Sequence, residues 1–236
     1  MSSHDSLAVF AALAAELQQE PDEALTSRAI VTRMRELVPE ADQVSLTIRT
    51  SRGHRTLASS DPVAEQADSL QYALGEGPCV EIADTGGWLR SGDVGADSRY
   101  PAWGPQAAGL GIGSLLAVAV TDRDGPLGAL NLYSARTGAF ADRDVVDIAL
   151  VYAVHATTAL SSARRASTLQ TAVSSRHVIG MAQGIAMERY GIDQHQSFEL
   201  LRRLSSTTNV KLRDVATQIV ETRAIPHDRT AEPVDD

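Results

Sequence analysis

The chain has 236 residues, of which 43% are hydrophobic, so it can bury one sizeable core and a second small one. Its single cysteine excludes an intramolecular disulfide framework. No apolar run of about 18 residues or more, long enough to span a membrane, is present, and no charged-then-apolar leader precedes the first helix pattern. We therefore expect a soluble, cytoplasmic protein with no membrane partner.

The net charge of −9 is unevenly distributed. Residues 1–163 contain 11 Lys or Arg against 21 Asp or Glu, residues 164–223 contain 9 against 5, and residues 224–236 contain 1 against 4. An acidic chain normally disfavours nucleic acid as a partner. The basic excess in residues 164–223 allows such a partner there, although an ordinary solvated helical face would have the same composition.

Helix and strand patterns follow one another in mixed order upstream of residue 140. The turn residues Asp122, Gly125 and Pro126 separate two strong strand patterns, which predicts a β-hairpin. The order of elements predicts an α+β fold. The predicted helices are residues 7–17, 24–37 and 63–74, the strands are residues 43–50, 55–58, 114–120 and 127–133, and short segments lie at 79–83 and 88–93.

A single long helix is predicted over residues 140–189, because neither glycine nor proline occurs between Gly138 and Gly180. At a rise of 1.5 Å per residue such a helix is roughly 75 Å long, and it needs lateral support. We therefore expect it to pair as a coiled coil with the same helix of a second chain, forming a homodimer. The apolar-to-small seam expected to pair consists of Val145, Ile148, Tyr152, His155 and Ala159.

The last part of the chain reads as a three-helix module. Gly191 is expected to end the long helix in the left-handed conformation, and Asp193 with Gln196 has the spacing of a capping box for a second helix. The polar run at residues 205–209 is predicted to be a turn, with Asn209 as the N-cap of a third helix. The apolar stripe of that third helix is Leu212, Val215, Ala216, Ile219 and Val220.

Two glycines, Gly180 and Gly184, lie one turn apart in the long helix. Each costs about 1 kcal/mol relative to alanine in a helix interior. We therefore expect a close approach to this face. Tight packing against the other two helices and approach of a nucleic-acid backbone both satisfy this expectation.

The two halves of this module, SRHVIGMAQGIAMERYG at residues 175–191 and FELLRRLSSTTNVKLRDVA at residues 198–216, closely resemble the ANTAR domain. The resemblance implies a domain over residues 161–223 that binds paired stem-loops with hexanucleotide loops in nascent mRNA. By holding these hairpins, such proteins prevent a transcription terminator from forming. Residues 224–236 are polar and contain proline, and we expect them to be disordered.

Candidate RNA-binding residues combine this resemblance with their chemistry. Amide and cationic side chains meet at the start of the third helix, where backbone N–H groups also favour phosphate. Polar residues of the turn and of the first two helices complete the set. The candidates are Arg176, Gln183, Arg202, Arg203, Ser205, Thr208, Asn209, Lys211 and Arg213.

The upstream region resembles a GAF domain over residues 5–160, through the segment LGEGPCVEI at residues 74–82 and the strand at residues 125–132. The resemblance implies a twisted antiparallel sheet flanked by helices, often with a small molecule on one face of the sheet. If a small-molecule ligand binds here, its expected lining is Cys79, Trp88, Asp93, Tyr100 and Trp103. Aromatic residues that simply fill the open side of the domain are an equal alternative.

Two other functions stay open. Residues 198–220 also fit a DNA-binding regulator with a helix-turn-helix-like module, although the expected turn is long for one. A redox sensor or enzyme centred on Cys79 is the other, but its chemistry needs a resolving thiol that the chain lacks. The six histidines have no metal-ligand spacing and no phosphate-binding glycine motif occurs. We expect no catalytic residue, no metal and no cofactor.

Overall fold

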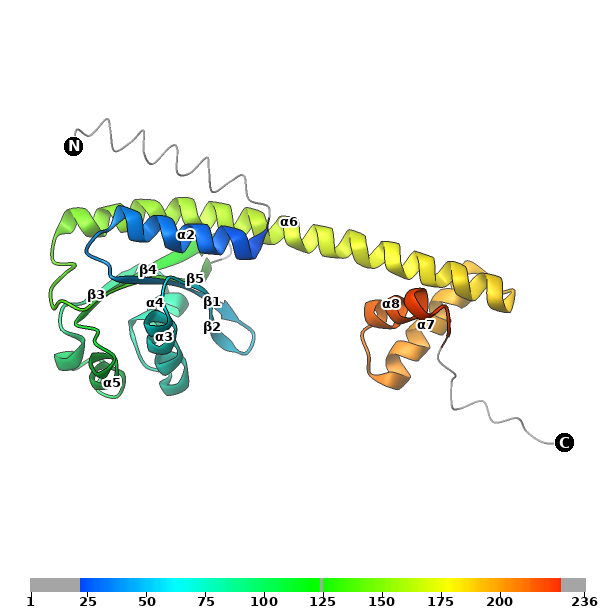
Figure 1. Cartoon of the computed structure of the whole chain (residues 1–236), viewed down its shortest axis with the longest axis horizontal. Coiled ribbons are helices and arrows are strands. Elements are labelled where there is room, and N and C mark those ends of the chain that lie inside the picture. Colours follow the sequence, from blue (N-terminus) through cyan, green and yellow to red (C-terminus); the bar gives the residue numbers. More distant parts are fainter. Residues whose placement is uncertain (1–21, 124, 226–236) are drawn as a thin grey trace, which may run out of the picture. The chain divides into compact units, whose positions relative to one another are not determined.

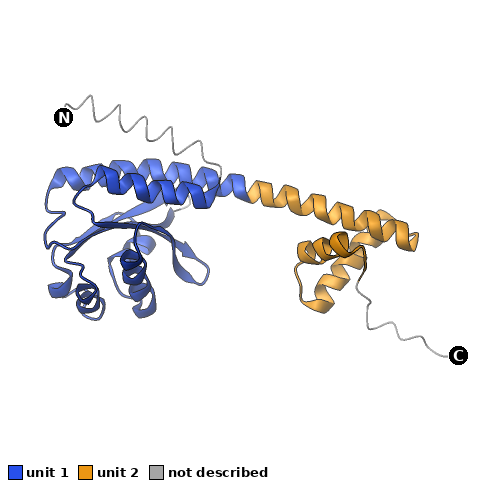
Figure 2. Ribbon diagram, in the orientation of Figure 1, with its two compact units in different colours: residues 1–167 blue, residues 168–236 orange. Residues whose placement is uncertain are grey.

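The computed structural model describes residues 22–123 and 125–225 (Figure 1). The chain divides into two compact units, residues 1–167 and residues 168–236 (Figure 2). The expected helix at residues 7–17 lies outside the described residues. The α+β class is confirmed, since unit 1 builds a sheet flanked by helices and the described part of unit 2 is helical.

The helices and strands follow the predicted order closely. Unit 1 contains α2 (Glu23–Leu37), β1 (Gln43–Thr50), β2 (Gly53–Ser59), α3 (Pro62–Leu74), α4 (Pro78–Thr85), β3 (Trp88–Ser91), the 3-10 turn η1 (Val94–Ala96), α5 (Trp103–Gly109), β4 (Ser114–Asp122) and β5 (Gly125–Ser134). Helix α6 (Arg143–Tyr190) begins in unit 1 and ends in unit 2, where α7 (Gln194–Thr208) and α8 (Leu212–Thr222) follow.

The sheet has the strand order β2-β1-β5-β4-β3, and all neighbouring strands are antiparallel. Strands β4 and β5 form the predicted hairpin. The central pair β1 and β5 joins distant parts of the chain, with Ser45 opposite Asn131. A side chain at Gly128 of β5 would collide with the carbonyl oxygen of Thr47 on β1, so glycine permits this close pairing.

The two faces of the sheet have different chemistry because side chains alternate along each strand. Val44, Leu46 and Ile48 of β1 point to the face covered by α2 and α6, where an apolar core forms. The other face lies under α3, α4 and α5 (Figure 1). There the central strands carry polar side chains, among them Ser45 and Thr47, that are also fully buried.

Helix α6 confirms the prediction of one long helix, but the predicted seam is wrong. Val145, Tyr152 and Ala159 are buried in the core of unit 1, and the Tyr152 hydroxyl donates a hydrogen bond to the Ile30 carbonyl at 3.0 Å. The sheet, and not a second chain, covers this stripe. Large apolar side chains that α6 leaves well exposed are Val151, Val154, Leu169, Val173 and Tyr190.

Among the described residues, α6 is also the one helix that is long and apolar enough to cross a membrane. Of the most apolar 18-residue stretch of α6, 56% is buried inside the protein. The core helix of a soluble protein has the same properties, so this observation is weak support for a membrane span.

The local signals that separate the helices of unit 2 are largely confirmed. Gly191 is left-handed with φ of 63°, and the Asp193–Gln196 capping box is formed. The predicted role of Asn209 is wrong, because it ends α7 in the left-handed conformation and Lys211 is the N-cap of α8. The turn is therefore shorter than predicted. Ile225 is buried in the core of unit 2, so the part of the expected tail that is described belongs to the fold.

Candidate functional site

The three helices of unit 2 pack around a small apolar core. Alanines on α6 let the other two helices come close, and leucine, valine and isoleucine side chains from α7 and α8 fill the space between them. Of the polar and charged side chains described in unit 2, Ser197 of α7 is buried and the others point outward. The buried residues are Ala182, Ala186, Leu201, Leu204, Val215, Ala216, Ile219 and Ile225.

Gln183, a candidate RNA contact, is engaged within the protein. Its side-chain amide donates to the Gln194 carbonyl at 3.0 Å and to the Ser197 hydroxyl at 3.2 Å. Since Ser197 is fully buried at the start of α7, these hydrogen bonds hold the first turn of α7 against α6. The structure therefore gives Gln183 a positioning role.

Of the three candidates that the sequence placed in a turn, two are bonded within the protein and one is not. The Ser205 hydroxyl donates to the Val210 carbonyl at 2.6 Å, and the Thr208 hydroxyl donates to the Leu204 carbonyl at 2.7 Å. Both hydroxyls stabilise the end of α7. Asn209 is exposed, and its side chain makes no hydrogen bond with the described residues. Of the three, Asn209 is the one whose side chain is available to a partner.

Three cationic candidates are exposed and make no ion pair within the described part of the chain. They are Arg176 on α6 and Lys211 and Arg213 at the start of α8. No side chain caps the first turn of α8, so its first backbone N–H groups are not bonded to a capping side chain. Lys211 and Arg213 lie at this same end of the helix, where N–H groups and positive charge together favour a phosphate. The other two candidates lie on α7, where Arg202 is 3.1 Å from the Glu199 carboxylate and Arg203 is exposed.

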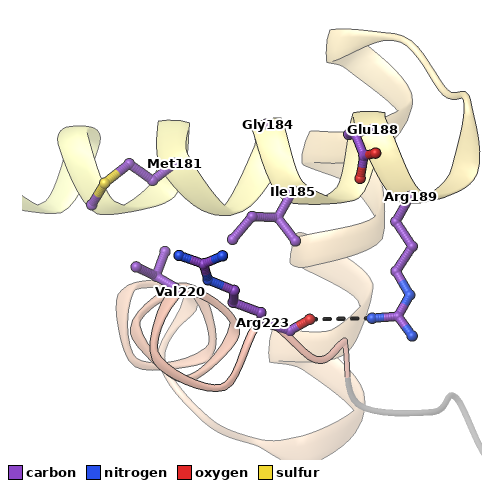
Figure 3. Close-up of a pocket in the computed structure, with 7 residues that line it drawn as sticks. All are labelled: Met181, Gly184, Ile185, Glu188, Arg189, Val220 and Arg223. Carbon is purple, nitrogen blue, oxygen red and sulfur yellow. Dashed lines mark hydrogen bonds between the residues drawn. The ribbon is translucent and has the colours of Figure 1, made fainter.

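A pocket between α6 and α8 adds residues that the sequence analysis did not select (Figure 3). Its volume is about 720 Å³. Arg189 donates a hydrogen bond to the Arg223 carbonyl at 3.1 Å, which joins the end of α6 to the end of α8. The pocket is lined by Met181, Gly184, Ile185, Glu188, Arg189, Val220 and Arg223. Arg223 lies outside the resembling segments, and only the fold brings it to Arg189.

The two glycines of α6 face open space. A Cβ added to Gly180 or Gly184 would meet no other part of the protein within 4 Å among the described residues. Tight packing against α7 and α8, one of the two explanations considered, is therefore wrong. The second explanation, approach of a partner from outside, is compatible with the structure, and Gly184 belongs to the pocket beside α8.

Unit 1 contains a buried polar cluster between the sheet and helices α3 and α4. Asp68 of α3 is its centre and is fully buried. It accepts hydrogen bonds from the Tyr133 hydroxyl, from Thr56 at 2.8 Å and from the Asn131 amide at 3.1 Å. These three donors are all neutral. The other members are Ser45, Thr47, Gln71, Tyr72 and Cys79.

Burial shifts the acidities of this cluster. Burial raises the pKa of Asp68 from 3.8 to about 6, although the surrounding donors oppose the shift. Burial, and then the neighbouring Asp68 carboxyl, raise the pKa of the Cys79 thiol well above its usual range. Cys79 is thus held as a thiol, 3.0 Å from the Thr47 hydroxyl, which argues against a reactive nucleophile at this position.

The five residues proposed to line a ligand pocket are not brought together. Cys79, Tyr100 and Trp103 are buried in the core under α3 to α5, where the Trp103 indole donates to the Ala67 carbonyl at 3.2 Å. Asp93 caps η1. Trp88 is 46% exposed and lines a small depression of about 190 Å³ with residues of α6, on the other face of the sheet. The aromatic residues near α5 therefore fill the domain.

No group of three or more His, Cys, Asp or Glu side chains that could hold a metal ion occurs in residues 22–123 and 125–225.

The comparisons with known families match both parts of the chain. The GAF domain family matches residues 20–161, and the ANTAR domain family matches residues 167–220. No curated protein matches the chain.

Several solved structures share the fold of unit 1. The GAF domain of a phosphoenolpyruvate-protein phosphotransferase from Coxiella burnetii is 17% identical with a TM-score of 0.55, covering 71% of this chain and 99% of that one. A free methionine-R-sulfoxide reductase from Neisseria meningitidis is 16% identical with a TM-score of 0.52, covering 67% and 89%. A bacteriophytochrome from R. palustris is 10% identical with a TM-score of 0.58, covering 78% of this chain and 42% of that one.

At these identities the structures show the fold alone. The family matches are independent of them, lie in the same order as the two structural units, and together cover most of the described residues. GAF domains are sensor domains and ANTAR domains are RNA-binding antitermination modules. The chain therefore belongs to the regulators in which a GAF domain is followed by an ANTAR domain.

Proposed function

We propose that this protein is a cytoplasmic, sensor-controlled antiterminator that binds paired hexaloop stem-loops in nascent mRNA and prevents a terminator from forming. The observation that carries the proposal is the ANTAR match on a compact helical unit. That unit also presents exposed cations, Arg176, Lys211 and Arg213, that have no partner among the described residues. Cations positioned in this way can fix an RNA backbone while unpaired loop bases are read.

We propose residues 161–223 as the RNA-binding domain and residues 5–160 as the sensor domain, with Ile225 added to the former because it is buried in the same core. For the sensor, we propose the buried polar cluster around Asp68 in place of the pocket first expected, and of the five residues expected to line that pocket only Cys79 belongs to the cluster. The oxygen Oδ1 of Asn131 is buried in this cluster without a hydrogen-bond partner in the described structure. A small polar ligand or a proton that reached this cluster would change its hydrogen bonding.

We also propose a homodimer formed through α6. The support is the exposure of four large apolar side chains, Val151, Val154, Leu169 and Val173, which are between 47% and 67% exposed. Val151 and Val154 are three residues apart, and Leu169 and Val173 are four apart, so the two side chains of each pair share a helix face. Pairing of two chains would present two RNA-binding units to paired stem-loops.

A DNA-binding regulator is the main competitor. The turn between α7 and α8 comprises only residues 209–211, so the objection that this turn is too long for a helix-turn-helix no longer holds. The choice between RNA and DNA therefore requires a direct comparison of the two ligands.

The decisive experiment is a titration of the full chain, at fixed salt, against a tandem hexaloop RNA, the same RNA with scrambled loops, and duplex DNA of equal length. We expect loop-dependent RNA binding that Lys211→Ala with Arg213→Ala weakens. Arg52→Ala with Arg55→Ala, which removes the same charge from exposed positions of unit 1, is the matched control and should bind as the wild type does. Stronger binding to the DNA would refute the proposal.

A further inference from the structure

A second pocket of unit 2 lies at the corner where α6 ends and α7 begins. It has a volume of about 550 Å³ and is lined by Tyr190, Ile192, Gln196, Glu199, Leu200 and Arg203. We propose that this pocket receives one unpaired base of the bound RNA loop and reads the base edge. The inference rests on the proposed RNA-binding function and assigns to it a specific site for base recognition.

The local sequence explains why the pocket forms. Gly191 takes the left-handed conformation that ends α6, and the Asp193 capping box starts α7 two residues later. The chain therefore reverses within a few residues, and Tyr190 faces a row of α7 side chains. That row is Gln196, Glu199, Leu200 and Arg203, at the spacing that shares one side of a helix.

The floor and wall of the pocket suit a flat, aromatic ligand. Ile192 and Leu200 are partly buried and pack against the core of unit 2, so they are fixed in place. Tyr190 is 52% exposed, although a large aromatic side chain gains by burial. Unpaired bases stack on such side chains in RNA complexes, because every base presents a π face.

The rim of the pocket supplies both a donor and an acceptor. The Gln196 oxygen accepts a hydrogen bond from the Asp193 N–H at 3.0 Å, which leaves the side-chain NH₂ group to donate outward. The Glu199 carboxylate accepts hydrogen bonds, and it already lies 3.1 Å from Arg202. A base edge with adjacent N–H donors and a carbonyl acceptor complements this pair, and guanine has such an edge.

Arginine side chains at the pocket supply positive charge that would attract the RNA backbone. Arg202 and Arg203 are neighbours on α7, and Arg203 lines the pocket itself. Guanidinium groups beside a stacking platform typically contact the phosphates that flank the extruded base. Aromatic, amide, carboxylate and guanidinium groups thus converge on one depression, which is the composition of base-reading sites.

The test uses the full chain and the tandem hexaloop RNA, together with its loop-scrambled version. We expect Tyr190→Ala to weaken binding of the intact loops about tenfold or more, the usual effect of losing one base stack. Binding of the scrambled RNA should change little, because the phosphate contacts remain. Tyr190→Phe, which keeps the ring, should retain wild-type binding. Phe198→Ala removes a 38% exposed ring from α7 outside the pocket and should also leave loop discrimination intact.

A second measurement identifies the base. Each loop guanine is replaced in turn by inosine, which lacks the exocyclic amine. At one loop position we expect inosine to weaken RNA binding by the wild-type protein. The same replacement should cause no further loss of affinity in Glu199→Gln, because that variant has already lost the contact with the amine. Tyr190 and Glu199 lie at the surface of unit 2, so we expect both variants to fold. Thermal melting of each variant checks this.

The outcomes separate the two proposals. Loop-specific binding by the wild type that Tyr190→Ala leaves unchanged overturns the base pocket and leaves the antiterminator function standing. A wild type that does not distinguish intact from scrambled loops overturns both.

Discussion

At the scale of single residues, unit 1 contains a fully buried carboxyl group, Asp68, that accepts hydrogen bonds from neutral donors. Asp68 accepts hydrogen bonds from the Thr56 hydroxyl on β2 and from the Asn131 amide and Tyr133 hydroxyl on β5. Hydrogen bonds to neutral donors offset only part of the free energy lost on removing a carboxylate from water. The protonated form is therefore favoured in the folded protein up to a pH of about 6.

The stability of unit 1 should consequently depend on pH through Asp68. Its pKa is raised from 3.8 to about 6 on folding, so the folded state binds more protons between these values and stability falls as pH rises through them. The full effect is at most roughly 3 kcal/mol, from the shift of about two pKa units. Asp68→Asn should abolish this dependence, as urea unfolding at pH 4.5 and 7 would measure. An equal change with pH in wild type and variant would contradict the assignment.

The cations at the start of α8 lead to a second prediction at this scale. Each phosphate neutralised by a cation contributes about 0.7 to 0.9 to the slope of log affinity against log salt. Lys211→Ala with Arg213→Ala should therefore reduce the slope by about 1.5. Binding isotherms at several salt concentrations give this slope. An unchanged slope would show that neither side chain contacts phosphate.

At the scale of elements, α6 serves each unit differently. In unit 1 it buries an apolar stripe against the sheet, while in unit 2 it supplies two alanines to a small core. Gly180 and Gly184, in the part of α6 that belongs to unit 2, lower the stability of the helix. They avoid no steric clash within the described structure, since both face open space. Helix propensity alone would favour alanine at both positions.

Gly184→Ala should therefore raise the free energy of unfolding of unit 2 by about 1 kcal/mol. If RNA approaches this face, the same variant should bind the hexaloop RNA more weakly, because the added methyl group occupies the pocket between α6 and α8. Denaturant unfolding and RNA titration measure the two effects on one sample. A more stable variant with unchanged affinity would show that the partner does not reach Gly184.

At the scale of the whole molecule, unit 1 and unit 2 share one helix, α6, and the basic excess of the chain lies in residues 164–223. Exposed apolar side chains on α6 occur in both units, which is the basis for the proposed dimer. Apolar side chains that lie together on a surface are typical of interfaces between proteins.

Leu169→Glu with Val173→Glu should convert the dimer to a monomer, because it places charge at the proposed contact between chains. Multi-angle light scattering at micromolar concentration reports the mass directly. Gln170→Glu, an exposed position on the adjoining side of α6, should leave the dimer intact. A wild-type protein that is monomeric under these conditions would refute the dimer.

The sequence by itself determined most of the elements and their order, because these depend on local signals, although no pattern predicted η1 or α5. Glycine at residue 191, the Asp193–Gln196 capping box, the strand at residues 43–50 and the long helix without glycine or proline each act within a few residues, and the structure confirms them. The two-part family assignment followed from contiguous motifs for the same reason.

Only the tertiary structure decided which side chains meet. Asp68 of α3 and Asn131 of β5 are 63 residues apart and meet where α3 packs on the sheet, so no local pattern pointed to their cluster. The alternation of β1 did mark Ser45 and Thr47 as facing away from the apolar core, but not that α3 would bury them. The seam on α6 was misassigned because the sheet covers the same apolar stripe that a second helix could have covered. Burial is a property of neighbours that are distant in sequence, and packing alone selects among them.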